Sequence, residues 1–223
     1  MRRRDLLDAL AERIVACDAA HPLRVAVDGI DAAGKTTLAD ELAAPLRARG
    51  RPVIRASLDS FHRPRAERYQ RGAASPEGYY LDTFDTAALR DALLVPLGPG
   101  GSRRYRRASF DFRTDRAVHA PLEEAPADAV LIVDGVFLLR PELVAHWDYR
   151  ILVEVPFAVV LERALRRDLA LFGSAEAVRA RYQQRYIPGQ QLYFAAERPQ
   201  QRADAIVRNE DPANPVLLLP DGG

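Results

Sequence analysis

The chain has 223 residues, of which 48% are hydrophobic, and its formal net charge is +1 at pH 7. This near-neutral charge gives no electrostatic argument for a nucleic-acid partner or for binding to an acidic membrane surface. The apolar fraction suffices for a folded core, and the length is typical of one domain, or of one domain with a small appended part.

Amphipathic stretches alternate with short apolar runs along the whole chain, and the two patterns predict helices and strands respectively. Between them, we expect an irregular segment over 60–80, and a loop with a hairpin over 97–121. The alternation predicts an α/β fold with a parallel sheet and helices on both faces, whose ligands bind at the carboxyl ends of the strands. The expected helices are 4–19, 35–50, 85–97, 141–147, 157–172 and 175–198, with a break at Pro188-Gly189. The expected strands are 23–29, 52–59, 128–139, 149–156, 203–212 and a short one within 215–219.

A single cysteine, Cys17, allows no disulfide framework, which is typical of proteins from a reducing cytoplasm. The cationic start is similar to that of a signal peptide, but Asp5, Asp8 and Glu12 interrupt any apolar segment, so we reject that interpretation. No apolar run has the length of a membrane span. We therefore expect a cytoplasmic protein with no membrane partner.

Residues 29–36, Gly-Ile-Asp-Ala-Ala-Gly-Lys-Thr, match the phosphate-loop pattern G-x-x-x-x-G-K-[ST] without a mismatch. In such a loop the main-chain N–H groups surround phosphates, and the following helix adds its positive end. The alternative is a chance glycine-rich turn, against which the preceding strand and the following helix argue. The residues expected to contact the nucleotide are Gly29, Asp31, Ala32, Ala33, Gly34, Lys35, Thr36 and Thr37.

Lys35 is the only lysine in a chain that has 32 basic residues. A compact ammonium group suits a narrow phosphate pocket, whereas the planar fork of arginine suits bidentate contacts. We predict that Lys35 reaches the β- and γ-phosphates of a nucleoside triphosphate and that the Thr36 hydroxyl binds Mg²⁺. The motif leaves open whether the γ-phosphoryl group goes to water, to a small molecule or nowhere.

Two aspartates stand at the ends of predicted strands. Asp59 is placed to orient a substrate hydroxyl and accept its proton, although it could equally cap the next turn through Ser60. Asp134 follows four apolar residues, which is the form of a Walker B carboxylate that holds Mg²⁺ opposite Thr36. Its alternative is an ordinary Asp-Gly turn with Gly135.

Three arginines, Arg163, Arg166 and Arg167, lie within two turns of a predicted helix. Such a cluster can close over transferring phosphates and neutralise the charge that develops there. The alternative is a solvated helix face on which Glu162 and Asp168 are the ion-pair partners.

Five segments follow one another in the chain: the phosphate loop, "DSFH" (59–62), "IVDG" (132–135), "RALRRD" (163–168) and the tail over 185–212. In this order they resemble the uridine kinase-like branch of P-loop kinases, which is related to phosphoribulokinase and pantothenate kinase. The resemblance covers roughly residues 22–212. It implies a kinase that uses ATP and Mg²⁺ to phosphorylate a primary hydroxyl, typically of a nucleoside.

The same resemblance implies particular roles for parts of the chain. Asp59 would be the catalytic base, and Arg163 and Arg167 would act from a lid over 161–175. Residues 97–121 would face the acceptor within a single kinase domain, 1–223. The tail residues Asn209, Asp211 and Pro212 would line the adenine pocket, unless they form a plain surface turn.

The acceptor-reading part of the family pattern is changed in this chain. His62 replaces a usual tyrosine, and the hairpin has Phe110-Asp111-Phe112 and later Asp115 where uridine kinases carry tyrosine and histidine. We expect His62, Tyr79, Phe110 and Arg166 to contact the acceptor, whose identity is in doubt. The arginines within 63–71 and 103–107 could bind an anionic acceptor or could be surface charge.

The prediction is therefore a small-molecule kinase, with nucleosides as the first acceptors and a sugar phosphate or pantothenate-like compound as the second. A nucleotide-binding switch without phosphotransfer is the competing class. Against it, the chain has no Asn-Lys-x-Asp guanine signature, because its one lysine is in the phosphate loop. Relatives are often oligomers, so a homo-oligomer stays open, although no exposed apolar stripe demands one.

Overall fold

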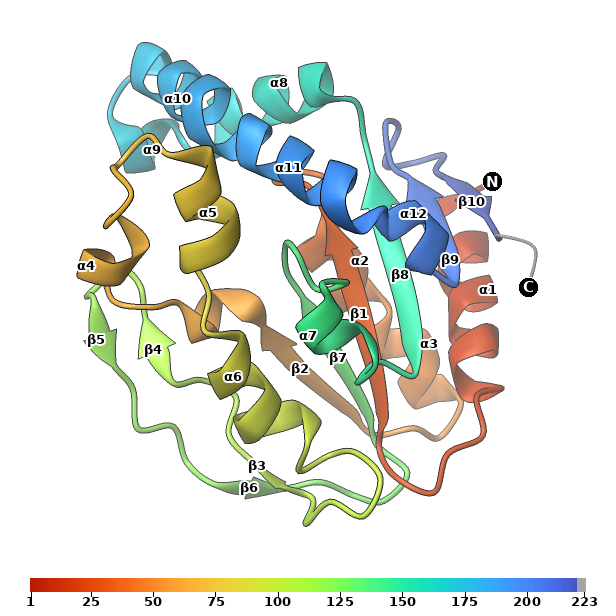
Figure 1. Ribbon diagram of the computed structural model, residues 1–223. Helices are drawn as coiled ribbons and strands as arrows, with labels where there is room; N and C mark the ends of the chain where they lie inside the picture. The colour runs from red at the N-terminus through yellow and green to blue at the C-terminus, as the bar shows by residue number, and fades with distance from the viewer. Residues whose placement is uncertain (220–223) are drawn as a thin grey trace.

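The computed structural model describes residues 1–219, which surround a six-stranded sheet of order β10-β9-β8-β1-β7-β2 (Figure 1). Five strands are parallel, as predicted, and the short β10 returns antiparallel to β9. All six expected strands are present, β1 with the expected bounds and the other five with shorter ones, so the α/β class with a parallel sheet is confirmed. The strands are β1 (Leu23–Gly29), β2 (Val53–Ser57), β7 (Val130–Asp134), β8 (Tyr149–Glu154), β9 (Ala205–Arg208) and β10 (Val216–Leu218).

Helices cover both faces of this sheet, and none of those in residues 1–219 combines the length and apolarity that a membrane crossing requires. They are α1 (Arg3–Val15), α2 (Lys35–Glu41), α3 (Ala43–Ala48), α4 (Arg65–Arg68), α5 (Pro76–Asp82), α6 (Thr86–Leu89), α7 (Pro141–Val144), α8 (Phe157–Arg167), α9 (Leu169–Phe172), α10 (Ala175–Arg181), α11 (Ile187–Glu197) and α12 (Pro199–Arg202).

The side chains of β7 show why the sheet needs two covered faces. Leu131 and Val133 belong to the hydrophobic cluster that includes α5, α6, α7 and α11, whereas Val130 and Ile132 belong to the cluster on the other face, with α1, α2, α8 and α10. Every residue of β7 is buried. Continuous apolar runs of this kind are typical of parallel strands that are buried on both sides.

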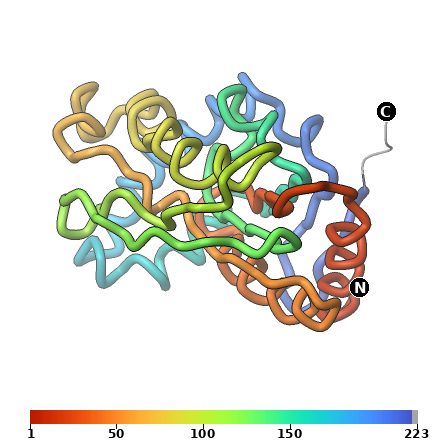
Figure 2. Tube along the Cα trace, turned by 90° about the horizontal axis from the view of Figure 1, so that it is seen from below, coloured from red at the N-terminus to blue at the C-terminus, as the bar shows by residue number. Residues whose placement is uncertain are grey.

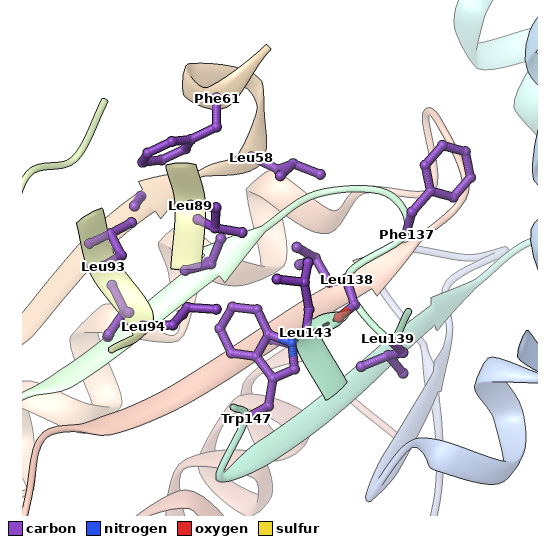
Figure 3. Packing of buried hydrophobic residues seen from close by; sticks show 14 of the residues in the cluster. Leu58, Phe61, Leu89, Leu93, Leu94, Phe137, Leu138, Leu139, Leu143 and Trp147 are labelled. Carbon is purple, nitrogen blue, oxygen red and sulfur yellow. Dashed lines mark hydrogen bonds between the residues drawn. The ribbon is translucent and has the colours of Figure 1, made fainter. Parts of the chain in front are cut away.

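The strand predicted over 128–139 ends at Asp134, and its last residues form a buried loop instead. Leu138 and Leu139 lie around α7, in the cluster that also contains Leu93 and Leu94, as Figure 3 shows. The Trp147 indole N–H donates a 2.8 Å hydrogen bond to the Leu138 carbonyl. Hydrophobicity alone cannot separate a buried strand from a buried loop, which explains the overlong prediction.

The expectation of an irregular segment over 60–80 is wrong, because α4 lies within it and α5 begins there. The Ser75 side chain accepts a 2.9 Å hydrogen bond from Gly78 N–H, and Pro76 occupies the first turn of α5. A serine cap followed by proline is a normal helix start. The signal was therefore present in the sequence.

The predicted break at Pro188-Gly189 is also wrong. A π-helical turn, Tyr182–Tyr186, joins α10 to α11, and Pro188 lies in the first turn of α11. Proline disturbs the helix interior because it lacks an N–H and its ring crowds the preceding turn. A wider turn just before it lets the chain stay helical from 175 to 197.

The hairpin expected within 97–121 is confirmed as β4 (Phe110–Asp111) paired with β5 (Arg116–Ala117). In addition, β3 (Arg104–Tyr105) pairs with β6 (Glu123–Glu124). Figure 2 shows the hairpin at the end of the molecule opposite the N-terminal helix α1. Strand β4 of the hairpin contacts the 3₁₀ turn Leu58–Phe61, which follows β2.

Candidate active site

The carboxyl ends of three neighbouring strands meet at one edge of the sheet. In the parallel register, Asp134 at the end of β7 lies opposite Val27 of β1 on one side and opposite Ser57 of β2 on the other. The phosphate loop follows β1 directly, and Asp59 stands two residues beyond the end of β2. The sheet therefore brings together the three sequence features that were expected to form the site.

Two glycines give the phosphate loop its shape. Gly34 has φ +94°, and a Cβ atom there would lie 2.5 Å from Nδ2 of Asn209. That amide donates a 2.7 Å hydrogen bond to the Ala33 carbonyl, and Asn209 is buried. Gly29 has φ +149°, and a Cβ there would collide with the Val153 carbonyl of β8. A side chain at either position would therefore displace the loop.

Arg163 connects the phosphate loop to the segment after β9 through hydrogen bonds to carbonyl groups of both. Its guanidinium donates hydrogen bonds of 3.4 Å to the Ala32 carbonyl and of 2.7 Å to the Asn209 carbonyl. It also lines a cavity of about 430 Å³ beside the loop, together with Lys35, Thr36 and Arg167. The arginine predicted to act on phosphates is thus held by four carbonyl groups, those of Ala32 and Ala33 in the loop and those of Asn209 and Glu210 after β9.

Lys35 and Thr36 begin α2 with their side chains turned toward the strand ends. The Lys35 ammonium donates a 2.8 Å hydrogen bond to the Ile30 carbonyl, and burial lowers its pKa. The Thr36 hydroxyl donates a 2.6 Å hydrogen bond to Oδ2 of Asp134. Arg55 of β2 forms a 2.9 Å salt bridge with the other oxygen, Oδ1, of that carboxylate. The predicted pair Thr36 and Asp134 is therefore in direct contact.

A cavity of about 450 Å³ opens over these groups. Two of the four predicted acceptor contacts do not line it: Arg166 is exposed and pairs with Glu162 at 2.6 Å, and Phe110 is buried in β4. The predicted residues that do line it are Asp31, Lys35, Thr36, Asp59, His62, Tyr79, Asp134 and Arg167.

The Asp59 carboxylate projects into this cavity from the turn after β2. The main-chain N–H of Asp59 donates a 3.3 Å hydrogen bond to the Ser57 hydroxyl, so Ser57 caps this turn. The alternative, in which Asp59 caps the turn through Ser60, is not observed. No hydrogen-bond donor in residues 1–219 is bonded to its carboxylate. Asp59 keeps contact with solvent at the cavity mouth, but partial desolvation by the cavity walls, aided by the nearby charge of Asp31, raises the pKa of Asp59 to about 6.

His62 and Phe112 form a stacked aromatic wall, with ring centroids 4.8 Å apart and planes inclined by 29°. The Nδ1 atom of His62 lies 2.8 Å from the Asp59 carbonyl, and burial lowers the pKa of His62 to about 4. The ring is therefore neutral at pH 7. In the hairpin it is Phe112, two residues after the predicted Phe110, that reaches the cavity.

Asp31, expected to contact nucleotide, turns toward the opposite wall. Its Oδ2 accepts hydrogen bonds from the Tyr79 hydroxyl at 2.8 Å and from Nε2 of Gln190 at 2.6 Å. Gln190 is buried in α11 and was absent from the sequence prediction. The phosphate loop is thus tied to α5 and α11 through one carboxylate.

The lid segment contributes Arg167 to the cavity wall. Its guanidinium donates to Oδ1 of Asp168 at 2.7 Å and to the Tyr182 hydroxyl at 3.1 Å. That hydroxyl in turn donates to Oδ2 of Asp168 at 2.7 Å. Sequence analysis assigned no role to Tyr182, which lies 15 residues from its partner and carries no local motif.

Comparison with known proteins gives relatives of the same kind. The chain is 27% identical over 188 residues to uridine-cytidine kinase B of Dictyostelium discoideum, which covers 84% of this chain and 74% of that protein. A possible uridine kinase from Bacillus stearothermophilus superposes with a TM-score of 0.71 at 25% identity, over 91% of this chain and 97% of that one. A putative fructose transport system kinase from Silicibacter sp. TM1040 gives a TM-score of 0.71 at 29% identity, over 86% and 95%. No family model matches the chain.

These comparisons support the predicted resemblance to uridine kinase-like P-loop kinases. The chain is an ATP-dependent phosphotransferase that acts on a small molecule. The predicted relationship is therefore confirmed. The cavity of this kinase contains an aspartate that faces the phosphate loop.

Behind the phosphate loop, this kinase has a buried polar connection that sequence analysis did not find. The Tyr193 hydroxyl of α11 donates a hydrogen bond to Oδ2 of Asp28, whose Oδ1 accepts from Gly29 N–H at 2.7 Å. Leu139 N–H donates to the same tyrosine oxygen at 3.2 Å. Burial raises the pKa of Asp28. These groups lie beneath the loop and fix its first glycine.

Proposed function

We propose that this kinase transfers the γ-phosphoryl group of ATP to a hydroxyl group that Asp59 orients and deprotonates. The single observation that carries the proposal is the Asp59 carboxylate, which shares one cavity with Lys35 and Thr36 of the phosphate loop. A pKa of about 6 keeps most of this carboxylate ionised at pH 7 while leaving it basic enough to accept a proton.

Thr36 and Asp134 are the proposed magnesium ligands. Magnesium in phosphotransferases usually takes one or two protein oxygens and completes its shell with phosphate and water. The site fits that demand, because a hydroxyl and a carboxylate lie 2.6 Å apart at the strand ends and no cluster of three or more His, Cys, Asp or Glu ligands occurs within residues 1–219. When bound, Mg²⁺–ATP supplies the phosphoryl group and a metal ion that neutralises charge on the phosphates.

Cationic side chains of the kinase surround the place proposed for the phosphates. Lys35 lies at the start of α2, and Arg163 and Arg167 reach the same cavity from α8. We propose that Lys35 and Arg167 stabilise the charge that develops during transfer. Arg163, which bonds to loop carbonyls, holds the loop in the shape that binds phosphate. The main-chain amides of Ala32, Ala33, Gly34 and Thr37 complete the proposed contacts.

The names of the relatives and the residues that line the cavity indicate which hydroxyl compounds could accept the phosphoryl group. A curated relative is named for uridine and cytidine, so nucleosides are the first candidates for the hydroxyl compound. A solved neighbour is named for fructose transport, and arginines line an extension of the cavity, so a sugar phosphate is the second candidate. His62, Tyr79 and Phe112 are the proposed acceptor contacts. We further propose that residues 1–223 form one kinase domain that acts in the cytoplasm.

Acceptor-dependent ATP consumption tests the proposal. The protein with Mg²⁺–ATP is screened against nucleosides, sugars, sugar phosphates and pantothenate, and a kinase accelerates sharply with the correct hydroxyl compound. Asp59→Asn should reduce turnover by about 10²-fold or more, the usual contribution of a general base, and should leave ATP affinity nearly unchanged. Asp128→Asn, on an exposed loop, is the matched control. Undiminished turnover in Asp59→Asn, or slow hydrolysis that no acceptor accelerates, would contradict the proposal.

A further inference from the structure

A second cavity of about 560 Å³ adjoins the one that contains Asp59. His62, Tyr79, Phe112 and Tyr186 line both cavities, so the two spaces share a wall and lie side by side. The lining residues of the second cavity come from α4, α5, α9, α10 and neighbouring segments, and Figure 1 shows these four helices together at one side of the sheet. Its volume is ordinary for a small-molecule site. We call it the arginine cavity, because Arg65, Arg68, Arg113, Arg181 and Arg185 line it.

No carboxylate lines the arginine cavity, in contrast to the aspartates around Lys35. Arg68 has one acidic partner, Asp115 of the hairpin, at 3.0 Å. Among the residues that the structure describes, the guanidinium groups of the other four arginines form no salt bridge, and Arg65 and Arg113 bond to nearby carboxylates only through their main-chain N–H groups. The cavity therefore carries a large excess of positive charge, and only Asp115 offsets it.

Two of these arginines are enclosed by the protein rather than extended into solvent. Arg185 is 2% exposed and Arg68 is 7% exposed. Arg185 donates to the carbonyl groups of Gly72, Ala73 and Ser75 at 3.2 Å, and its guanidinium carbon lies 4.8 Å from the centre of the Tyr69 ring. Neutral carbonyls and an aromatic face hold the guanidinium in place but leave its charge uncompensated, which is costly in a buried position.

Arg181 is the half-buried member that shows the same arrangement. Its guanidinium donates to the Ala73 carbonyl at 2.6 Å and lies 5.9 Å from the centres of the Tyr69 and Phe172 rings. Aromatic contacts and main-chain acceptors limit its motion without neutralising it. A guanidinium that is held in this way is prepared to bind phosphate or carboxylate oxygens.

We infer that the phosphate acceptor is an anion, whose phosphate or carboxylate group binds in the arginine cavity while its hydroxyl group lies at Asp59. The inference rests on the proposed function, because it names the substrate class of the same site. It distinguishes a charged hydroxyl compound from a neutral nucleoside. The aromatic residues His62, Tyr79 and Phe112 then line the middle of the bound molecule, between its two polar ends.

Matched pairs of acceptors test the charge requirement. Uridine is compared with uridine 3′-monophosphate, fructose with fructose 6-phosphate, and pantothenol with pantothenate, at constant ionic strength. Each pair keeps a free hydroxyl and changes the charge, and the pairs separate phosphate from carboxylate as the source of the anion. We expect kcat/KM to be at least about tenfold higher for the charged member of the pair that is used. Equal or faster use of the neutral member overturns the inference while leaving the kinase proposal intact.

A binding measurement tests the cavity without any turnover. Inorganic phosphate is titrated by calorimetry into wild-type protein, Arg181→Gln and Arg179→Gln, each in the presence of Mg²⁺ and a non-hydrolysable ATP analogue. Arg179 lies on the same helix, is exposed and lines neither cavity. We expect Arg181→Gln to weaken phosphate binding at least about fivefold and Arg179→Gln to leave it unchanged.

The possible outcomes separate the inference from a purely structural role of these arginines. If Arg181→Gln lowers the midpoint of thermal unfolding but binds phosphate like the wild type, Arg181 only fixes the loop near Ala73 and the inference fails. Absence of saturable phosphate binding to the wild-type protein also overturns it. If the acceptor screen finds no phosphotransfer but phosphate binding depends on Arg181, the proposed reaction is wrong and the anion site stands.

Discussion

Arg55 and Asp134 form a 2.9 Å salt bridge between neighbouring strands, and the second oxygen of the same carboxylate bonds to Thr36. The Asp134 side chain is therefore held from both sides, at a position that is only 4% exposed. Fixing a metal-binding carboxylate by a second hydrogen bond orients its remaining lone pairs. Arg55 is thus a positioning residue for the proposed magnesium ligand.

Replacing Arg55 by glutamine should reduce the affinity for Mg²⁺ about tenfold, the usual effect of losing a partner of a metal ligand. The measurement is a magnesium titration of turnover at saturating ATP, together with binding of the ATP analogue at high magnesium. Arg51→Gln is the matched control, since Arg51 precedes the same strand and bonds only to the Asp128 carbonyl, at 2.6 Å. An unchanged magnesium midpoint in Arg55→Gln, with the fold intact, would show that Asp134 needs no such partner.

The raised pKa of Asp59 predicts a pH-dependent cost to stability. In the unfolded chain the carboxyl group has a pKa near 3.9, and in the folded protein it is about 6, chiefly because of desolvation. Folding therefore favours the protonated form, so this group adds stability below about pH 4 and the contribution is lost as pH rises through 6. Asp59→Asn, which cannot ionise, should unfold at a higher temperature than the wild type at pH 8, by about 2 °C or more.

At pH 4.5 the wild-type carboxyl is largely protonated in the folded state, so the difference between the two proteins should be much smaller. Thermal unfolding followed by circular dichroism without ligands, at pH 4.5 and 8, measures both differences. The same variant that loses turnover would then be the more stable protein at pH 8. A gain of equal size at both pH values would mean that charge on Asp59 is not its cause.

The sequence predicted the parallel sheet and the phosphate loop because both signals are local. Buried parallel strands read as short apolar runs, and the loop needs eight consecutive residues of fixed type. Asp59 and Asp134 followed from the rule that ligands bind at carboxyl ends of strands. Both side chains line one cavity, because three adjacent strands end together.

What the sequence did not predict depends on partners far apart in the chain. Asp31 bonds to Gln190 across 159 positions, and no periodicity connects the two. The sequence also could not predict which residues line the arginine cavity. They come from α4, α5, the hairpin and α10, which meet only in the folded protein. Strands of two residues, such as β4, are too short for alternation to show which side chain faces inward.

Gly34 and Asn209 form a close contact that the phosphate loop depends on. Gly34→Ala would place a Cβ atom 2.5 Å from Nδ2 of Asn209 and would put alanine at φ +94°, so we expect ATP-analogue affinity to fall at least about tenfold. Asn209→Ala removes the 2.7 Å bond to the Ala33 carbonyl and should cause a smaller loss. Calorimetric titration of the analogue measures both.

The double variant Gly34→Ala/Asn209→Ala separates the two causes of the loss. Removing the amide relieves the clash but not the backbone strain, so the double variant should bind the analogue better than Gly34→Ala alone and worse than Asn209→Ala alone. Strictly additive losses would mean that the two residues do not interact.

Phe110 and Phe112 lie two positions apart on the hairpin, yet the structure gives them different surroundings. Phe112 stacks on His62 at 4.8 Å and lines both cavities, whereas Phe110 is 9% exposed and lines neither. Phe112→Leu should therefore raise KM for the acceptor several-fold, with little change in KM for ATP, because an aromatic contact with the substrate is lost.

Phe110→Leu is the matched change in the same hairpin. It should lower the midpoint of thermal unfolding by removing buried aromatic contacts while leaving KM for the acceptor unchanged. Steady-state kinetics with the acceptor found in the screen, combined with thermal unfolding of both variants, checks the assignment. If Phe110→Leu instead raises acceptor KM and Phe112→Leu does not, the first of the two rings contacts the acceptor, as the family resemblance alone would have it.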